Sequence, residues 1–243
     1  MYKNFGVKME KYKRNIALVG QENQTKLQNS YVCVFGVGGV GGYAIEALAR
    51  AGVGKIDIYD FDVVSESNIN RQIIALTSSI GIKKTQLMVQ RVKDINSKID
   101  ITGFDIKVCQ ENIDQICFDD VDYIIDCIDT ITSKVLLIEK AKNMNIPIIS
   151  CMGTGNKLDP KQLEITDIQK TSVCPLARVM RKLLKQKQIS KLDVLYSKEM
   201  PIVPTLDLAE QQTKKVPPAS MIFVPSVAGI MLAQKVVMDL MEK

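Results

Sequence analysis

The chain has 243 residues, of which 46% are hydrophobic and 24% charged, so it can bury the core of one large α/β domain. Its formal net charge of +5 permits an anionic partner but does not require one, because nucleic-acid binding depends on how the basic residues cluster. It contains no histidine, which excludes His-dependent catalytic triads, His-liganded metals and a histidine general base.

From residue 31 onward, the chain alternates between predicted strands and predicted helices. The first strand is Tyr31–Phe35, a run of β-branched and aromatic residues that ends at Gly36. The elements that follow are a helix at 40–51, a strand at 55–60, a helix at 82–95, strands at 99–108 and 121–125, a helix at 133–145 and a strand at 146–151. This alternation predicts a Rossmann-like α/β fold, with a mostly parallel sheet and helices on both faces.

After Gly155 the pattern changes and predicts a smaller, mixed C-terminal extension. It contains an alternating strand at 162–168, a helix from 175 to about 187, a strand at 194–198 and a closing helix at 229–241. Residues 200–218 are polar with four prolines, which is typical of a mobile surface loop. The apolar stretch 219–233 is interrupted by Pro225 and is shorter than the ~20 residues of a spanning helix, so we expect it to be buried and expect no membrane association.

Six cysteines are present, and none belongs to a Cys-x-x-Cys pair. Residues 1–13 form no apolar export signal, so we expect a cytoplasmic protein whose thiols are reduced. Cys127 and Cys151 lie near the ends of predicted strands, where we interpret them as small core residues and not as nucleophiles.

A glycine-rich turn joins the first strand to the first helix. Gly36, Gly38, Gly39 and Gly41 form Gly-x-Gly-x-x-Gly, which lets backbone N–H groups approach a phosphate at a helix N-terminus. Asp60 ends the next strand, at the spacing of a carboxylate that binds a ribose. The alternative is a tight turn with no ligand, and the motif alone does not distinguish NAD from ATP.

The polar residues that follow favour a triphosphate. They are a second carboxylate, an amide, two cations and a carboxylate after a buried strand: Asp62, Asn70, Arg71, Lys84 and Asp129. The pyrophosphate of NAD needs no such cations, whereas attack at an α-phosphorus does, because charge builds on the departing pyrophosphate. We therefore predict that Arg71, Lys84 and Asp129 are catalytic, with Asp129 able to hold Mg²⁺. The ordinary alternatives are a surface ion pair for Arg71, a surface lysine for Lys84 and a helix N-cap for Asp129.

These motifs resemble those of the ThiF/MoeB family of carboxylate-adenylating enzymes. The resemblance begins near Arg14, includes GxGGxG, D-x-D, S-N-x-N-R-Q, G-x-x-K and D-x-x-D, and continues to the C-terminus. It implies ATP in the glycine crevice, with Asp60 on the ribose, Asn70, Arg71 and Lys84 on the phosphates, and Asp129 on Mg²⁺. It also implies a homodimer, in which Arg14 reaches the ATP of the partner. We expect a single adenylating domain over 1–243, with a nucleotide-binding core at 1–155 and a substrate-binding and dimerisation part at 156–243.

The part after Gly155 resembles one branch of this family, whose members dehydrate threonylcarbamoyladenosine in tRNA. The resemblance rests on Gly153-x-Gly155-x-x-Leu158-Asp159-Pro160 and the residues up to Ala177. It implies ATP-dependent adenylation of the threonyl carboxylate next to the anticodon, after which the urea oxygen closes a ring. A sulfur acceptor linked to a cysteine desulfurase is a further candidate partner.

Three other functions remain open. The first is an adenylyltransferase for a ubiquitin-like sulfur-carrier protein, although the two Cys-x-x-Cys pairs of the usual zinc site are absent from the sequence. The others are an NAD-dependent oxidoreductase and a nucleotide-sensing dimer without catalysis.

The helix at 175–187 carries a basic stripe opposite an apolar one. Leu176, Val179, Met180 and Leu183 are expected to face the core, and no acidic residue interrupts the basic face. That face consists of Arg178, Arg181, Lys182 and Lys185. We predict that these four residues bind tRNA phosphates; the alternative is a face that is only solvated.

Overall fold

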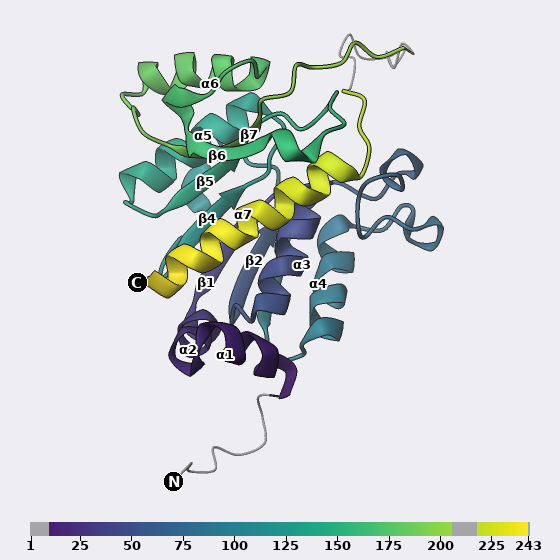
Figure 1. Cartoon of the computed structure of the whole chain (residues 1–243), viewed down its shortest axis with the longest axis vertical. Helices are drawn as coiled ribbons and strands as arrows, with labels where there is room; N and C mark the ends of the chain where they lie inside the picture. Colours follow the sequence, from purple (N-terminus) through teal and green to yellow (C-terminus); the bar gives the residue numbers. More distant parts are fainter. Residues whose placement is uncertain (1–9, 206–217, 243) are drawn as a thin grey trace.

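The computed structural model describes residues 10–205 and 218–242. Most of the loop predicted at 200–218 therefore lies outside the described residues. The described part contains one seven-stranded sheet with helices on both faces (Figure 1).

The sheet has the strand order β3-β2-β1-β4-β5-β7-β6. The six strands from β3 to β7 in this order are parallel to their neighbours, and only β6 is antiparallel, to β7. The strands are β1 (Tyr31–Phe35), β2 (Lys55–Tyr59), β3 (Asp100–Phe104), β4 (Tyr123–Asp126), β5 (Ile148–Cys151), β6 (Leu163–Asp167) and β7 (Asp193–Ser197). The prediction of a mostly parallel Rossmann-like sheet is confirmed, and the mixed C-terminal part extends this same sheet.

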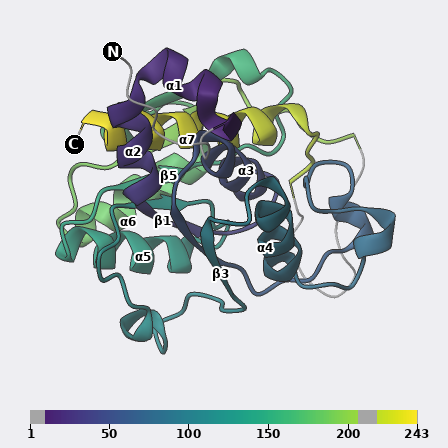
Figure 2. The same cartoon turned by 90° about the horizontal axis from the view of Figure 1, so that it is seen from below.

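Two layers of helices cover the sheet (Figures 1 and 2). One layer holds α1 (Lys13–Val19), α2 (Gln21–Asn29), α3 (Gly41–Ala51), α4 (Lys84–Ile95) and α7 (Phe223–Glu242). The other holds α5 (Ile131–Asn143) and α6 (Pro175–Gln186). Short 3-10 helices occur at Glu10–Tyr12, Glu66–Asn68, Thr77–Ser79, Ile113–Gln115, Pro160–Gln162 and Ile168–Lys170.

The central strand β1 contributes to a hydrophobic core on each face of the sheet. Val32 and Val34 belong to the core shared with α3, α4 and α7, whereas Cys33 and Phe35 belong to the core shared with α5 and α6. Successive side chains of a strand point to opposite faces, so a strand covered on both faces is apolar along its whole length. This explains why β1 is recognisable in the sequence.

Helix α7 begins at Phe223, six residues before the predicted start at 229. Pro225 does not interrupt it, because it occupies the first turn, where the missing N–H of proline costs no helical hydrogen bond. By length and composition alone this helix could span a membrane. In the structure its buried side chains pack on the sheet and on α3, as Figure 1 shows for the long diagonal helix.

The register of the sheet aligns the carboxyl ends of β2, β1 and β4. Phe35 pairs with Tyr59 on one side and with Asp126 on the other. The chain continues in the same pattern, since the N–H of Gly36 donates to the Tyr59 carbonyl at 2.8 Å and the N–H of Cys127 donates to the Phe35 carbonyl at 2.7 Å. The strand order reverses between β1 and β4, which is where ligands bind in doubly wound sheets.

Candidate functional site

Two glycines of the turn after β1 are required by the fold itself. Gly36 has a φ of +91°, and a Cβ there would lie 2.7 Å from the carbonyl oxygen of Cys127. A Cβ on Gly41 would lie 1.7 Å from the carbonyl oxygen of Gly36. Both contacts are with backbone atoms, so no side chain could move aside. Gly36 and Gly41 therefore make the tight strand-to-helix turn possible.

The other two glycines of the motif have no comparable reason in the packing. A Cβ on Gly38 would meet only Nε2 of Gln72, at 3.9 Å, and a Cβ on Gly39 would make ordinary contacts with Pro225 and Arg71 at 3.4 and 3.5 Å. Their missing side chains leave the backbone open at the start of α3, whose N-cap receives no side-chain hydrogen bond. Such a surface fits an anion, because the first N–H groups of a helix lack helical partners.

Asp60 fastens this turn to the end of β2. Its Oδ2 accepts the N–H of Val37 at 2.7 Å, and its Oδ1 accepts the N–H of Asp62 at 2.8 Å. Burial raises the pKa of Asp60, although Lys84 and the two backbone donors act in the opposite direction. Each carboxylate oxygen retains a second lone pair, so the group can still accept from a ligand hydroxyl.

The two predicted cations are held by acceptors of the protein. Lys84 is the first residue of α4, is only 5% exposed, and places Nζ 2.8 Å from Oδ2 of Asp62. Nη1 of Arg71 donates to the carbonyl of Ser67 at 2.7 Å and to Oδ1 of Asn70 at 2.9 Å. Burial lowers the pKa of Arg71 from its usual high value. Near Gly39 it is the aliphatic stem of Arg71 that borders the open backbone, with its Cγ and Cδ 3.5 and 3.7 Å from the place of a Cβ, while the guanidinium is held by Ser67 and Asn70.

Asn70 connects this region to the C-terminal part of the chain. Its Nδ2 donates to the carbonyl of Ser220 at 2.8 Å, just before α7. The ring of Pro225 in α7 lies against Gly39, because its Cβ stands only 3.4 Å from the place that a Cβ on this glycine would occupy. The first turn of α7 therefore forms part of the wall around the glycines, which the sequence alone did not indicate.

The loop after β4 rests on a buried ion pair that sequence reasoning missed. Nζ of Lys134 lies 2.9 Å from Oδ2 of Asp126, and both side chains are completely buried. The same lysine donates to the carbonyl of Ile128 at 3.0 Å, and the carboxylate accepts from the hydroxyl of Ser150 at 2.6 Å and from the N–H of Ile128 at 3.0 Å. The only signal for this pair was a lysine among the apolar residues of α5.

Asp129 follows on the same loop and is exposed. Its Oδ1 accepts from the hydroxyl of Thr130 at 3.2 Å, and the N-cap of α5 is Thr130. The ordinary alternative, that Asp129 is the N-cap, is therefore wrong. Cys127, two residues earlier, borders Gly36 through its backbone carbonyl, so the loop that carries Asp129 begins at the glycine turn.

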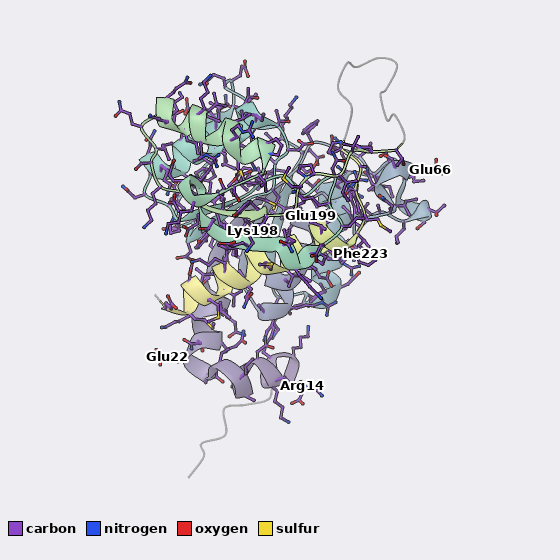
Figure 3. All side chains as sticks on the ribbon, turned by 45° about the horizontal axis from the view of Figure 1, so that its top comes forward. Arg14, Glu22, Glu66, Lys198, Glu199 and Phe223 are labelled. Carbon is purple, nitrogen blue, oxygen red and sulfur yellow. The ribbon has the colours of Figure 1, made fainter. Side chains whose placement is uncertain are left out.

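The structure does not bring Arg14 to this site. Arg14 is exposed on α1, and the amide of its neighbour Asn15 donates to the carbonyls of Arg50 and Ala51, both at 3.3 Å. These carbonyls are at the C-terminal end of α3, about 16 Å along the helix from the glycine turn. Figure 3 shows Arg14 at the lower end of the molecule, far from Glu66 at the upper right. Arg14 therefore cannot contact a ligand at the glycines of its own chain.

Helix α6 only partly matches the predicted basic stripe. Arg178, Lys182 and Lys185 are exposed. Arg181 is half-buried, and its Nη1 bonds the hydroxyl of Thr171 and, at 3.1 Å, the carbonyl of Thr171. It is thus not a free surface cation, because it fastens α6 to the preceding segment.

The apolar face of α6 also differs from the prediction. Ala177, Met180 and Leu184 are its buried residues, whereas Val179, expected to face the core, is 41% exposed. The face of α6 that points into the core is therefore the one that carries Ala177, Met180 and Leu184, at positions i, i+3 and i+7. This orientation explains why Arg181 lies at the edge of the buried face.

The thiols near the turn are unsuited to nucleophilic attack. Burial raises the pKa of Cys151 to about 12 and raises that of Cys127 well above its ordinary value. A thiol must be deprotonated to react, so both remain neutral near pH 7. Their interpretation as core residues agrees with their positions in the structure.

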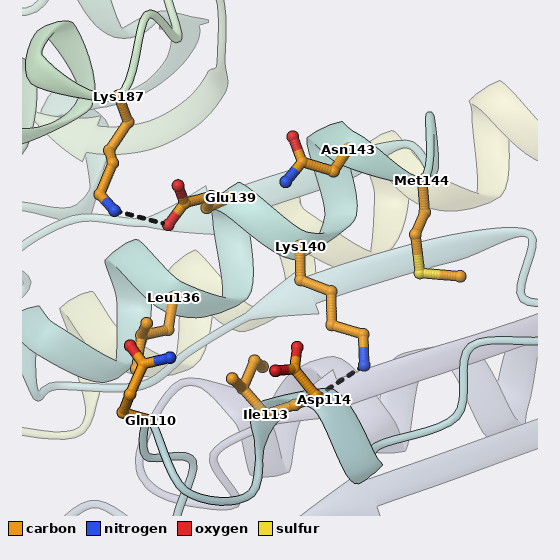
Figure 4. Close-up of a pocket in the computed structure, with 9 residues that line it drawn as sticks. All are labelled: Gln110, Ile113, Asp114, Leu136, Glu139, Lys140, Asn143, Met144 and Lys187. Carbon is orange, nitrogen blue, oxygen red and sulfur yellow. Dashed lines mark hydrogen bonds and ion pairs between the residues drawn. The ribbon is translucent and has the colours of Figure 1, made fainter.

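A surface hollow of about 470 Å³ lies away from the glycine turn, against α5 (Figure 4). Three of its charged groups, Glu139, Lys140 and Lys187, are satisfied by the protein itself. Nζ of Lys140 donates to the carbonyls of Ile113 and Ile116, both at 2.6 Å, and Glu139 pairs with Lys187 at 3.0 Å. We therefore place the candidate site at the glycine turn and not at this hollow.

Comparison with known proteins finds relatives that match nearly the whole chain. The profile described as the ThiF family matches residues 12–241. A tRNA threonylcarbamoyladenosine dehydratase of Bacillus subtilis is 41% identical over 243 residues, which cover 96% of each chain. The structure of the Escherichia coli tRNA N6-threonylcarbamoyladenosine dehydratase TcdA in complex with ATP superposes with a TM-score of 0.83, at 31% identity and with 95% of each chain covered.

The family also includes relatives of the alternative kind. An adenylyltransferase and sulfurtransferase, UBA4 of Vanderwaltozyma polyspora, is 35% identical over 155 residues. That match covers 64% of this chain but only 35% of the relative. The similarity to this relative is therefore restricted to part of both proteins.

Proposed function

The chain belongs to the ThiF family, and we propose that it is an ATP-dependent enzyme that dehydrates N6-threonylcarbamoyladenosine next to the anticodon of tRNA. The observation that carries the proposal is one continuous arrangement. The open backbone of the glycine turn lies beside the Arg71 side chain. Asp60 accepts hydrogen bonds both from Val37 in this turn and from Asp62, and Asp62 in turn pairs with Lys84. The B. subtilis relative, matched over nearly its whole length, supports the choice of substrate.

In the proposed reaction, the threonyl carboxylate attacks the α-phosphorus of ATP. An acyl-adenylate forms and pyrophosphate leaves, so negative charge grows on the phosphate oxygens. Arg71 and Lys84 are preorganised cations that can stabilise this charge, and both are partly desolvated, which strengthens their effect. The carboxylate of Asp60 would accept hydrogen bonds from the ribose.

The second step is intramolecular. The urea group of the same nucleoside attacks the activated carbonyl, AMP leaves, and the net change is the loss of one water from the nucleoside. Positioning two groups of one substrate can replace much of the contribution of a catalytic base. This suits a chain without histidine, whose thiols near the turn are held neutral.

Mg²⁺ is part of the proposal, and the donors present fit it. Asp129 is an exposed carboxylate on the loop whose Cys127 borders the glycine turn, and Mg²⁺ typically binds one or two carboxylates together with substrate phosphates. Among the described residues, no group of three or more His, Cys, Asp or Glu side chains gathers to form a cage for a metal. When bound, Mg²⁺ would neutralise phosphate charge.

We also propose that the enzyme is a cytoplasmic homodimer. The distance of Arg14 from the glycine turn of its own chain supports a role toward the second chain, as the family resemblance implies. Leu18, 87% exposed on the same helix, gives α1 an apolar contact for that partner. Measurement of molecular mass by light scattering tests the dimer.

The tRNA is proposed to contact α6. Arg178, Lys182 and Lys185 form its exposed cations, and Arg181 is now assigned to the fold. The sulfur-carrier adenylyltransferase stays the second candidate, with partial similarity to UBA4 in its favour. A sulfur acceptor linked to a cysteine desulfurase would be a partner of either function.

Mass analysis of nucleosides tests the proposal. The tRNA is incubated with enzyme and Mg-ATP, digested, and compared with a sample lacking ATP. We expect threonylcarbamoyladenosine to lose one water and ATP to yield AMP and pyrophosphate. Lys84→Ala should lower turnover by ~10²–10³-fold, as does the loss of one preorganised donor in other enzymes. An unchanged nucleoside, or ADP as the main product, would refute the mechanism.

A further inference from the structure

Asn156, on the loop that follows β5, binds two segments that are distant in the sequence. Its carbonyl accepts the N–H of Ile202 at 2.8 Å. Its own N–H donates to the carbonyl of Ala219 at 2.7 Å, and its Oδ1 accepts the N–H of Ala219 at 2.7 Å. Asn156 therefore uses its backbone and its side chain together to hold both polar backbone groups of Ala219, just before α7.

The local backbone is suited to this close contact. Asn156 has a φ of +58°, and asparagine adopts this left-handed conformation more readily than most residues other than glycine. A Cβ on the preceding residue, Gly155, would lie 2.6 Å from Cβ of Pro218. A side chain at 155 would therefore push the loop away from the segment before α7, and the contact with Ala219 requires a glycine there.

The segment held by Asn156 reaches the cation beside the glycine turn. The carbonyl of Ser220, next to Ala219, accepts a hydrogen bond from Nδ2 of Asn70 at 2.8 Å. Oδ1 of the same amide accepts from Nη1 of Arg71 at 2.9 Å. Only this orientation of the amide satisfies both neighbours, because a carbonyl accepts and a guanidinium donates. The position of Ser220 therefore fixes the amide, and the amide in turn holds the guanidinium.

We propose that Asn156 is a positioning residue for Arg71. By fixing the segment 219–220, to which Asn70 is bound, it places the guanidinium for the proposed reaction; we call this connection the relay. The inference rests on the proposed function, because it takes Arg71 as the cation that stabilises charge on the departing pyrophosphate. A misplacement of about 1 Å can cost on the order of 10²-fold in rate. Since the carbonyl of Ser67 also holds Arg71, loss of the relay should displace the guanidinium and not release it.

Release of pyrophosphate tests this role, measured in a single turnover of the full chain with Mg-ATP and tRNA that carries threonylcarbamoyladenosine. Asn156→Gly keeps the left-handed backbone and its backbone hydrogen bonds but removes Oδ1. At saturating ATP its rate should fall roughly 10- to 100-fold. Its Kd for Mg-ATP, measured by calorimetry, should stay near the wild-type value, because the charge that Arg71 stabilises grows only in the transition state. Asn156→Asp retains the acceptor oxygen and should recover most of the rate.

A double variant tests whether the effect passes through Asn70. Asn70→Ala removes the last step of the relay and should itself slow the release of pyrophosphate. Addition of Asn156→Gly to Asn70→Ala should then cause little further loss, because residues that act through one network do not have additive effects. Losses that multiply in the double variant would show that Asn156 does not act through Asn70, and would overturn the proposal.

Asn145→Gly is the matched control. Asn145 also has a positive φ, of +55°, but it lies in the turn before β5, at the opposite end of that strand. This variant should release pyrophosphate at the wild-type rate. A loss equal to that of Asn156→Gly would show a general effect of glycine in a loop, and would overturn the proposal.

A wild-type rate in Asn156→Gly, or in Asn156→Ala if the glycine variant does not fold, would overturn the role of Asn156 and leave the proposed function intact. Failure of Asn156→Asp to recover the rate would do the same, because the acceptor oxygen would then not be the group that matters. Absence of pyrophosphate release by the wild type would instead refute the proposed function itself.

Discussion

Replacement of Lys134 by methionine should be among the most destabilising single changes in this chain. The change leaves the carboxylate of Asp126 completely buried without its cation, which stood 2.9 Å away. At that distance and an effective dielectric constant of about 20, the attraction is about 6 kcal/mol before desolvation is subtracted. Removal of one partner of a buried pair typically costs ~3–5 kcal/mol. Because Ser150 and the N–H of Ile128 still donate to Asp126, we expect about 3 kcal/mol.

Urea unfolding followed by far-UV circular dichroism measures this cost. Lys187→Met is the control, since Lys187 pairs with Glu139 at a similar 3.0 Å but both side chains are partly exposed. A pair of that kind contributes at most about 1 kcal/mol. The double variant Lys134→Met/Asp126→Leu should recover much of the loss, because it removes the unpaired charge. A loss below about 1 kcal/mol for Lys134→Met, or no recovery in the double variant, would refute this reasoning.

Substitutions at the glycines and on α6 provide three further predictions. Gly36→Ala should destabilise the fold by about 3 kcal/mol or more, because Gly36 has a positive φ and a Cβ there would clash with the backbone. Gly38→Ala should fold normally but bind ATP at least ~10-fold more weakly by calorimetry. Equal effects of the two variants would contradict the assignment of Gly36 to the fold and of Gly38 to ligand binding. A Cβ on Gly229 would lie 2.2 Å from the carbonyl oxygen of Val40, so Gly229→Ala should push α7 away from α3. We expect the Tm measured by calorimetry to fall by roughly 3–10 °C, and an unchanged Tm would argue against this contact. Replacement of the three exposed basic residues of α6 by glutamine should reduce the log–log salt slope of tRNA binding by roughly 2–3 units without loss of stability. An unchanged slope would show that the basic face of α6 is only solvated and binds no tRNA phosphate. The residues to replace are Arg178, Lys182 and Lys185, with Arg181 left in place because it fastens the helix.

Sequence patterns alone were enough to predict the fold class and the composition of the glycine turn. Both depend on local patterns: the apolar run of β1, the alternation of strands with helices, and four glycines at a fixed spacing. It did not indicate α1 and α2. Among the nine residues of α2 only Leu27 is apolar, so no periodic stripe exists, and the helix forms because the folded sheet and α7 supply its contacts. The start of α7 was also missed, because Pro225 stands in the first turn of the helix, where a proline does not interrupt it.

The polar residues that serve the fold can be distinguished from those that remain available to a ligand only in the folded chain. In sequence, Arg181 is equivalent to its basic neighbours, but its guanidinium is bound to Thr171. Lys134 is one lysine among many, yet it is buried against Asp126. Asn156 is one polar residue of a loop, and only the folded chain reveals that it holds Ala219. Hydrogen bonds and burial depend on atoms far apart in the chain, so no local pattern encodes them, whereas backbone conformation and hydrophobic period are set by neighbouring residues.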